Sequence, residues 1–427
     1  MIQVKNEYAF IPADTNTTVL NLNGDWNFSV YIYGHHEAGS SDVSGYTVNL
    51  NGPKISYGLE GADAKGGGNA TDNHVKVSTG TVNGLVAGGY SSKGSAIGNS
   101  VEIEGGTFSP SYGTAVAGGA SAASASGNAN QNTVIIKGGN FERDVAGGLV
   151  KDPIGSGNAN ENRVTISGGE IGTSESGNIR GGYAVYSGTA NNNTVEISGG
   201  KINKNVYGGE SNYGEASGNT VTISGNPTFA ADSSIYGAYS RAGNAQNNTV
   251  NILASGLTIK SLFGGLVYDV AEGGTSSGNT LNIAATGVTA GSVDAFQTIA
   301  LSTGDIDIGN GEKAASLLKF TDGATVLSSS SFKNADGSNF TGTLDITKTD
   351  FTGTGKMTLL ASGTNDNFTT LKLAYDDATK TNPKTLDATT PSVVVKSGGG
   401  RNPVKQGCSH HHGRHHPYRI PRYDQHL

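Results

Sequence analysis

The chain has 427 residues, of which 66 are glycine and one, Cys408, is cysteine, so glycine is about twice as frequent as usual and an internal disulfide is excluded. Charged residues make up 15% and hydrophobic residues 35%, which excludes a chain kept disordered by its own charge and leaves too few long apolar runs for a compact core of this length. The formal net charge is −7 without a basic stripe and no run of about 18 apolar residues occurs, so we expect neither a nucleic-acid partner nor membrane insertion by this chain itself.

Residues 1–44 are predicted to form an N-terminal cap and a first, irregular coil. They begin MIQVKNEYAFIPADTN, which contains no apolar run of about 7–15 residues such as a signal peptide has. A signal peptide is therefore not predicted, and the sequence of this chain does not explain its export.

A repeated motif organises residues 45–286. It consists of Asn-x-(Val/Leu)-x-(Val/Ile) followed by a glycine-rich turn, and adjacent copies are about 29 residues apart on average, a spacing typical of solenoids. The leading residues of the copies are Asn73, Asn99, Asn132, Asn162, Asn193, Asn219, Asn248 and Asn279.

Each repeat contains two or three short strands and no stretch long enough for an ordinary helix. Residues 193–197 alternate apolar and polar side chains, which predicts a strand with one buried face, and Gly199 and Gly200 end it. A second apolar segment, 205–207, is followed by Gly208 and Gly209. We expect such paired glycines at corners, where the backbone needs a positive φ or the absence of a Cβ.

One repeat cannot bury its own apolar face, because ordering each residue costs roughly 1–2 kcal/mol. If each repeat is one turn of a coil, its strands pair in parallel with those of the next turn, and Val195, Val221 and Val250 form an interior column. The leading asparagines would then stack about 4.8 Å apart, with their amides hydrogen-bonded along the axis as a ladder. The sequence therefore predicts an all-β, right-handed parallel β-helix with coils of about 30 residues.

The length of the repeat varies mainly between the second glycine pair and the next asparagine. In a solenoid such variation falls in loops on one side of the stack, often the side that binds a partner. We expect any binding residues to lie there.

Residues 287–374 are predicted to continue the coil with shorter turns and to cap it, with strands at 298–301, 306–308, 344–346 and 357–360. Residues 375–400 are predicted to be a linker. Residues 401–427 form a histidine-rich tail that we expect to be disordered, because its histidines lack the spacing of a structural metal site. The alternative is metal binding, with neutral imidazoles as ligands; the candidates are His410, His411, His412, His415 and His416.

None of the motifs that could indicate enzyme or cofactor chemistry has the surrounding sequence that such chemistry needs. Residues 309–314 match Gly-x-Gly-x-x-Ala but lack the surrounding βαβ unit of a dinucleotide site. Lys76, Glu102 and Glu196 occupy outward strand positions in different turns and are expected on a solvated face. Arg143 and Asp144 are adjacent and so point to opposite sides of a strand. We therefore expect no catalytic residue and no cofactor.

Three aromatic residues recur at one repeat position: Tyr207, Tyr236 and Phe263. They could bind sugar rings if the column faced solvent. The alternative, which we favour, is an aromatic stack that supports the coil, since same-face neighbours in adjacent strands pack together.

Residues 217–225 and 205–209 resemble the repeats in passenger domains of autotransporter proteins of Gram-negative bacteria. The resemblance extends over about residues 45–283, and residues 291–299 resemble the segment that follows such repeats. It implies a right-handed parallel β-helix that is exported, passes through an outer-membrane barrel and is displayed on the cell surface as an adhesin-like stalk. We expect this chain to lack the family's signal peptide and C-terminal barrel strands.

The leading functional hypothesis is a non-enzymatic surface passenger domain that acts as an adhesin or stalk through its projecting loops. Its partner would be a glycan or protein on a host cell or neighbouring cell. One alternative is a carbohydrate-active β-helix enzyme, which would need two carboxylates, or a carboxylate with an arginine, within about 10 Å on one face. The other alternative is a purely structural surface spacer.

Overall fold

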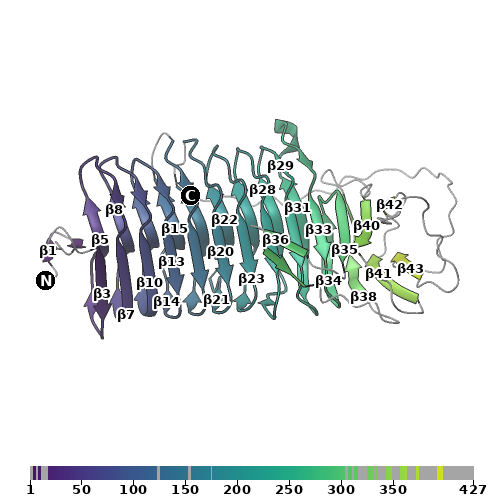
Figure 1. Ribbon diagram of the computed structural model, residues 1–427, viewed down its shortest axis with the longest axis horizontal. Helices are drawn as coiled ribbons and strands as arrows, with labels where there is room; N and C mark the ends of the chain where they lie inside the picture. The colour runs from purple at the N-terminus through teal and green to yellow at the C-terminus, as the bar shows by residue number, and fades with distance from the viewer. Residues whose placement is uncertain are drawn as a thin grey trace.

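The computed structural model describes residues 18–122, 126–151, 155–174, 176–302 and 312–315, and the backbone of short strands at 3–5, 8–10, 306–309, 325–330, 332–333, 343–348, 356–362, 372–374 and 392–397. The described residues form an elongated β-solenoid of strands stacked one after another along the axis, from β1 (Gln3–Lys5) at one end to β43 (Ser392–Ser397) at the other (Figure 1). The one helical segment among them is the 3-10 turn η1 (Val270–Glu272). The prediction of an all-β parallel coil is confirmed.

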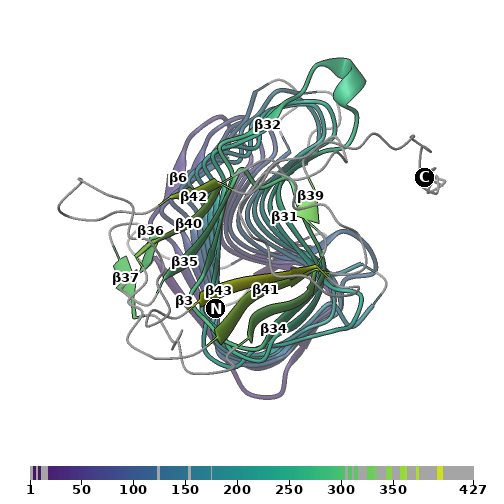
Figure 2. The ribbon, with the colours of Figure 1, turned by 90° about the vertical axis from the view of Figure 1, so that its right-hand side faces the viewer.

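One coil shows how the chain winds. A sheet B strand, β23 (Thr194–Ile197), is followed by a two-residue strand, β24 (Lys201–Ile202), and then by a sheet A strand, β25 (Val206–Ser211). A loop then leads to the next coil, where β26 (Thr220–Ile223), β27 (Thr228–Phe229) and β28 (Ser234–Ser240) pair in parallel with these three strands. Seen along the axis, β31 (Thr258–Val267) of sheet A lies on the opposite side of the coil from β35 (Thr298–Ser302) and β40 (Thr343–Lys348) of sheet B (Figure 2).

Sheet A is parallel throughout, except that β1 and β2 form an antiparallel pair at its N-terminal edge. Its strands are β1 (Gln3–Lys5), β2 (Tyr8–Phe10), β5 (Tyr31–Glu37), β8 (Leu59–Ala64), β11 (Val86–Ser91), β15 (Thr114–Ser121), β19 (Asp144–Val150), β22 (Ile179–Ala184), β25, β28 (Ser234–Ser240), β31 (Thr258–Val267), β34 (Val288–Asp294), β38 (Thr325–Ser330), β39 (Phe332–Lys333), β41 (Lys356–Ser362) and β43 (Ser392–Ser397).

Sheet B covers the opposite side and turns a corner into a row of two-residue strands. Its main strands are β3 (Val19–Asn23), β7 (Thr47–Ile55), β10 (His74–Val82), β13 (Ser100–Ile103), β17 (Thr133–Ile136), β20 (Arg163–Ile166), β23, β26 (Thr220–Ile223), β30 (Thr249–Ile252), β33 (Thr280–Ile283), β35 (Thr298–Ser302), β40 (Thr343–Lys348) and β42 (Lys372–Ala374). The short strands are β4 (Asn27–Phe28), β14 (Thr107–Phe108), β18 (Asn140–Phe141), β21 (Glu170–Ile171), β24 and β27 (Thr228–Phe229).

Small pairings complete the coil. A third sheet contains β6 (Val43–Ser44), β9 (Ala70–Thr71), β12 (Ala96–Ile97) and β16 (Ala129–Asn130), and β29 (Ala245–Gln246) pairs with β32 (Ser276–Ser277). The strands β36 (Ile306–Gly309) and β37 (Glu312–Ala314) form an antiparallel hairpin.

The interior consists of columns of identical or similar side chains. Val195, Val221 and Val250 are in register and fully buried, as predicted. Phe108 and Phe141, one coil apart, stack with ring centroids 4.7 Å apart. Because each coil covers the apolar side of the previous one, the core grows with every repeat.

The second glycine pair does not lie at a corner, which corrects the prediction for Gly208 and Gly209. Both lie within β25 and are buried. A Cβ on Gly208 would lie 2.3 Å from the backbone oxygen of Gly237, and one on Gly209 would lie 2.7 Å from the amide nitrogen of Asn219. These glycines therefore make room for the neighbouring coil and the asparagine. By contrast Gly200, with a φ of +85°, occupies a turn as expected.

The C-terminal predictions are only partly covered by the described residues. The strands expected at 298–301, 306–308, 344–346 and 357–360 coincide with β35, β36, β40 and β41. Within the stretch predicted as a linker, β43 pairs in parallel with β41. Residues 401–427, with all five candidate metal-binding histidines, lie outside the described residues.

Candidate functional site

The eight repeated asparagines lie at the corner before each sheet B strand and form a ladder. Each is at most 1% exposed. The Oδ1 atom of Asn219 accepts hydrogen bonds from the backbone N–H of Asn193 at 2.9 Å and from its side-chain amide at 3.0 Å, and Asn248 does the same for Asn219. At the end of the ladder the side-chain oxygen of Gln297 accepts the hydrogen bond from the Asn279 N–H. The ladder stabilises the coil and leaves no group for a ligand.

The outward face of sheet B carries solvated ion pairs that connect neighbouring coils. Lys76 lies 2.7 Å from Glu104, and Lys137 lies 2.6 Å from Glu102. Hydrogen bonds to these lysines lower the pKa of both glutamates. Because the lysines are well exposed, such pairs contribute little to stability. The prediction of a solvated face is confirmed for Lys76, whose side chain is 35% exposed. It is wrong for Glu196, whose side chain is 15% exposed and contacts Arg163 at 2.6 Å.

The outward face of sheet A is different, because aromatic side chains gather on it between β22 and β31. We call this surface, with the loops that follow its strands, the tyrosine face. It contains seven of the 17 tyrosines in the chain and one phenylalanine: Tyr183, Tyr186, Tyr207, Tyr213, Tyr236, Tyr239, Phe263 and Tyr268.

The middle of the tyrosine face is the recurring aromatic column. The ring centroids of Tyr207 and Tyr236 lie 4.6 Å apart, as do those of Tyr236 and Phe263, and both pairs are nearly parallel. Each ring face is therefore covered by the next ring, which leaves mainly edges for a ligand. Of the two interpretations of this column, the geometry supports the stack that stabilises the coil.

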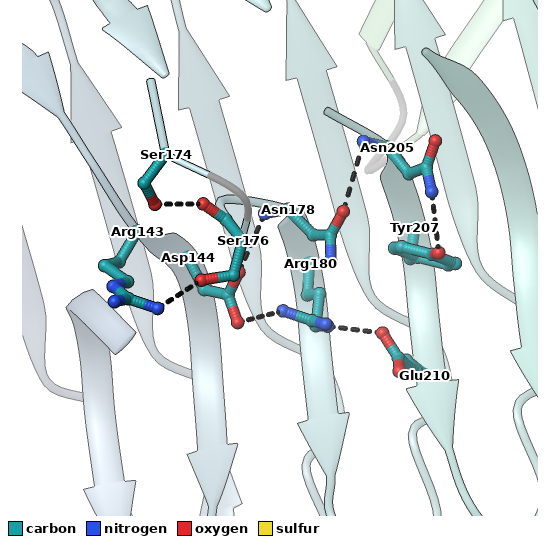
Figure 3. Close-up of polar contacts among 9 residues, drawn as sticks. All are labelled: Arg143, Asp144, Ser174, Ser176, Asn178, Arg180, Asn205, Tyr207 and Glu210. Carbon is teal, nitrogen blue, oxygen red and sulfur yellow. Dashed lines mark hydrogen bonds and ion pairs between the residues drawn. The ribbon is translucent and has the colours of Figure 1, made fainter. Parts of the chain in front are cut away.

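Arg180 lies between two carboxylates at the N-terminal border of the tyrosine face (Figure 3). Its Nη1 is 2.6 Å from Oδ2 of Asp144 on β19, and its Nε donates to Oε2 of Glu210 on β25. The three side chains are 7%, 15% and 12% exposed. We call these residues the arginine cluster; it joins three consecutive coils.

Aromatic rings complete the surroundings of the guanidinium. Arg180 lies over the ring of Tyr183 at 4.3 Å and near that of Tyr207 at 5.6 Å. Burial alone lowers the pKa of Arg180, but Glu210 and Asp144 outweigh it, so the pKa lies well above its ordinary value. Burial, reinforced by Glu210, raises the pKa of Tyr183 to about 12. Arg180 and the Tyr183 phenol therefore keep their protons at neutral pH.

Arg143 lies in the bend before β19 and not in the strand, so the prediction that it and Asp144 point to opposite faces of a strand does not apply. The two side chains have separate partners. Arg143 Nη1 donates to Ser176 Oγ at 2.7 Å, whereas Asp144 Oδ1 accepts from the backbone N–H of Asn178 at 2.8 Å (Figure 3). The repeat pattern does not connect Asp144 with Arg180, because neither charged residue recurs in the neighbouring coils.

A second charged group, the carboxyl cluster, lies on the same sheet near the N-terminal end. It consists of His36 on β5 with Glu60 and Asp63 on β8, and Tyr90 lies in the next strand, β11. His36 Nδ1 is 2.8 Å from Asp63 Oδ2. Glu60 and Asp63 are 5% and 4% exposed, and Glu60 Oε2 and Asp63 Oδ1 have no hydrogen-bond partner.

The surroundings of the carboxyl cluster favour protonated acids. Burial, with the charge of Asp63, raises the pKa of Glu60 well above 4.5. Burial raises the pKa of Asp63 also, although His36 opposes this. Within the part of the chain that the structure describes, no three His, Cys, Asp or Glu side chains are placed to hold a metal ion.

Three tyrosines of the tyrosine face lie in the projecting loops and are open to solvent. Tyr186, Tyr213 and Tyr268 are 39%, 38% and 54% exposed. The rings of Tyr186 and Tyr213 meet edge to face with centroids 5.1 Å apart. The last of these loops carries η1 and projects beyond its neighbours (Figures 1 and 2). These loop tyrosines do not follow the repeat and were not predicted, although tyrosine is concentrated between residues 183 and 268.

Comparisons with models of known protein families, with curated proteins and with solved structures find no match to this chain. The described residues also contain no helix with the length and apolar character needed to span a membrane.

Proposed function

We propose that this chain is a non-enzymatic passenger domain of the autotransporter type, displayed on the surface of a Gram-negative cell. It acts as an adhesin that binds a glycan or protein of a host cell or neighbouring cell. The tyrosine face and its projecting loops form the contact surface.

The observation that carries this proposal is the exposure of Tyr186, Tyr213 and Tyr268 on loops of the same side of the solenoid. Tyrosine presents a large rigid surface with a polar end at little entropic cost, and it is enriched in binding hot spots. Exposed aromatic groups gathered on one surface indicate interaction sites. The loops whose length varies between repeats are predicted to lie on one side of the solenoid, and these three tyrosines lie in such loops.

The carbohydrate-active enzyme remains the second candidate, because the arginine cluster meets the geometric condition set for it. Two carboxylates contact one arginine on one face of the solenoid. Both carboxylates are, however, engaged by the same guanidinium, and all three side chains are mostly buried. This arrangement favours a structural role, in which Arg180 and the two carboxylates connect coils. It does not favour a catalytic role, in which the carboxylates would contact a substrate as acid and base.

Cell-binding and glycan-array assays with the purified chain test the adhesin proposal. The variant combines Tyr186→Ala, Tyr213→Ala and Tyr268→Ala, and the matched control combines Tyr57→Ala and Tyr112→Ala, which are 49% and 86% exposed elsewhere on the surface. We expect the first variant to lose about tenfold or more in affinity and the control to bind normally. Equal binding by both variants would refute the assignment of the tyrosine face.

The same preparations separate the other two hypotheses. Release of new reducing ends or unsaturated sugars from polysaccharides, abolished by Glu210→Gln, would establish the enzyme. Absence of any ligand, together with high protease resistance, would establish the structural spacer.

A further inference from the structure

Arg241 is a cation of the tyrosine face that forms no ion pair within the described residues. It follows directly after β28, and its side chain is exposed. Arg163 on sheet B, by contrast, contacts Glu196 at 2.6 Å, and Arg180 is held by two carboxylates. The guanidinium of Arg241 is therefore available to an anionic partner.

One aromatic ring lies directly against this guanidinium, and further tyrosines are nearby. The guanidinium lies over the ring of Tyr213 at 5.4 Å, and the ring of Tyr186 lies next to that of Tyr213. Burial, reinforced by Glu210 and Tyr268 and opposed by Arg241, raises the pKa of the Tyr239 phenol to about 12. Tyr268 and Arg241 therefore both lie close enough to the Tyr239 phenol to affect its pKa.

The backbone holds these groups in place. The Tyr268 N–H donates to Ser240 O at 3.0 Å, and the Asp269 N–H donates to Arg241 O at 2.7 Å. The Gly243 N–H donates to Ser240 Oγ at 2.7 Å and fixes the loop after Arg241. The loops of two adjacent coils therefore run side by side and present Arg241 and Tyr268 together.

The charges near Arg241 leave it free to bind an anion. Glu210 is engaged by Arg180, and the acids of the neighbouring loops, Glu215, Asp269 and Glu272, form no ion pair with Arg241. A planar guanidinium matches a carboxylate through two parallel hydrogen bonds. A tyrosine ring beside it offers an apolar surface to the C–H groups of a pyranose, and phenol hydroxyls bond to sugar hydroxyls.

We infer that Arg241, Tyr213 and Tyr268 form a subsite for the carboxylate-bearing unit of an acidic glycan, such as a uronic or sialic acid. Arg241 pairs with the carboxylate, the Tyr213 ring contacts the sugar ring, and the Tyr268 hydroxyl bonds to a sugar hydroxyl. This inference rests on the proposed function and names the ligand class of the tyrosine face.

The test measures binding of the full chain to polygalacturonate and 3′-sialyllactose, with carboxyl-reduced polygalacturonate and lactose as neutral counterparts. The variants are Arg241→Gln and Arg241→Lys. The control is Lys93→Gln, an exposed cation in the corresponding loop of an earlier coil. We expect Arg241→Gln to weaken binding of the acidic ligand about tenfold or more, Arg241→Lys to weaken it less because the bidentate geometry is lost but the charge remains, and Lys93→Gln to have no effect. The preference for acidic over neutral ligands should also fall as salt is added.

The outcomes separate this inference from the proposed function. If neutral ligands bind as well as acidic ones, if no acidic ligand binds, or if Arg241→Gln has no effect, the subsite is wrong. If the triple tyrosine variant still abolishes cell binding in that case, the proposed function stands. If neither the tyrosine variant nor Arg241→Gln changes any binding, both are overturned.

Discussion

The outward faces of sheets A and B belong to the same coils, but the residues at their outward positions follow different patterns along the axis. On sheet B, threonine, asparagine and paired charges recur from coil to coil, as in the contact of Lys201 with Glu170 at 2.8 Å. On sheet A the outward residues change along the axis, from the carboxyl cluster on β8 through Ala117 and Ala146 to the tyrosine face. The residues that repeat from coil to coil stabilise the solenoid. The outward residues of sheet A that do not repeat are the candidates for a binding role.

Replacing Arg180 is expected to change the free energy of unfolding more than any other single substitution proposed for this chain. Arg180→Met leaves Asp144 and Glu210 buried without their partner, which should cost about 3–5 kcal/mol of unfolding free energy. Denaturant titration measures the change. The triple variant Asp144→Asn, Arg180→Met, Glu210→Gln should recover most of it, since no charge is then left unpaired. Little change in the single variant would show that sheet A is as tolerant of charge loss as sheet B.

A slightly smaller effect is expected at the corner between the sheets. Asn219→Ala removes the acceptor of two buried N–H groups of Asn193, which should cost roughly 2–3 kcal/mol. The matched control is Asn21→Ala, which removes the acceptor of an exposed side-chain bond from Asn49 and should cost less than about 0.5 kcal/mol. Equal costs for the two variants would contradict the role of the buried ladder.

The carboxyl cluster should make stability depend on pH. The raised pKa of Glu60 means that the folded chain holds this proton at a pH where the unfolded chain has lost it. Stability is therefore greatest below the unfolded pKa of 4.5 and falls as the pH rises through the folded value. Glu60→Gln should flatten this decline, raising the thermal midpoint at about pH 8 relative to that at about pH 5. Parallel pH profiles for the two proteins would count against a protonated Glu60.

The smallest effect is expected on sheet B. Lys201 and Glu170 are 58% and 36% exposed, so Lys201→Ala should move the thermal midpoint by less than about 1 °C. Differential scanning calorimetry is sensitive enough for this comparison. A shift as large as that of an arginine-cluster variant would remove the distinction between the two faces.

The parts of the fold that repeat could be predicted from the sequence. The strand at 193–197, the column containing Val195 and the ladder containing Asn219 follow from apolar alternation and a fixed spacing. The role of Gly208 and Gly209 could not be predicted, because a glycine can be required for its φ or for its missing Cβ and the sequence does not distinguish the two. Only the neighbouring coil shows that the space is needed.

The arginine cluster and the loop tyrosines could not be predicted for a different reason. Asp144 is not in register with Arg180, whose partner on β19 is Ala146. Their contact depends on side-chain length and direction, which the repeat pattern does not contain. Aligning the copies on their glycine pairs would have placed Arg180 beside Tyr207, but not the charge pairing or the exposure of Tyr213 in the loop.

Hydroxyl-radical footprinting of the chain bound to the cells to which it adheres tests whether the tyrosine face is the contact surface, because the reagent labels tyrosines that are open to solvent. We expect Tyr186, Tyr213 and Tyr268 to lose labelling on binding and Tyr57 and Tyr112 to keep theirs. Protection of Tyr57 or Tyr112 with continued labelling of the three loop tyrosines would contradict this expectation.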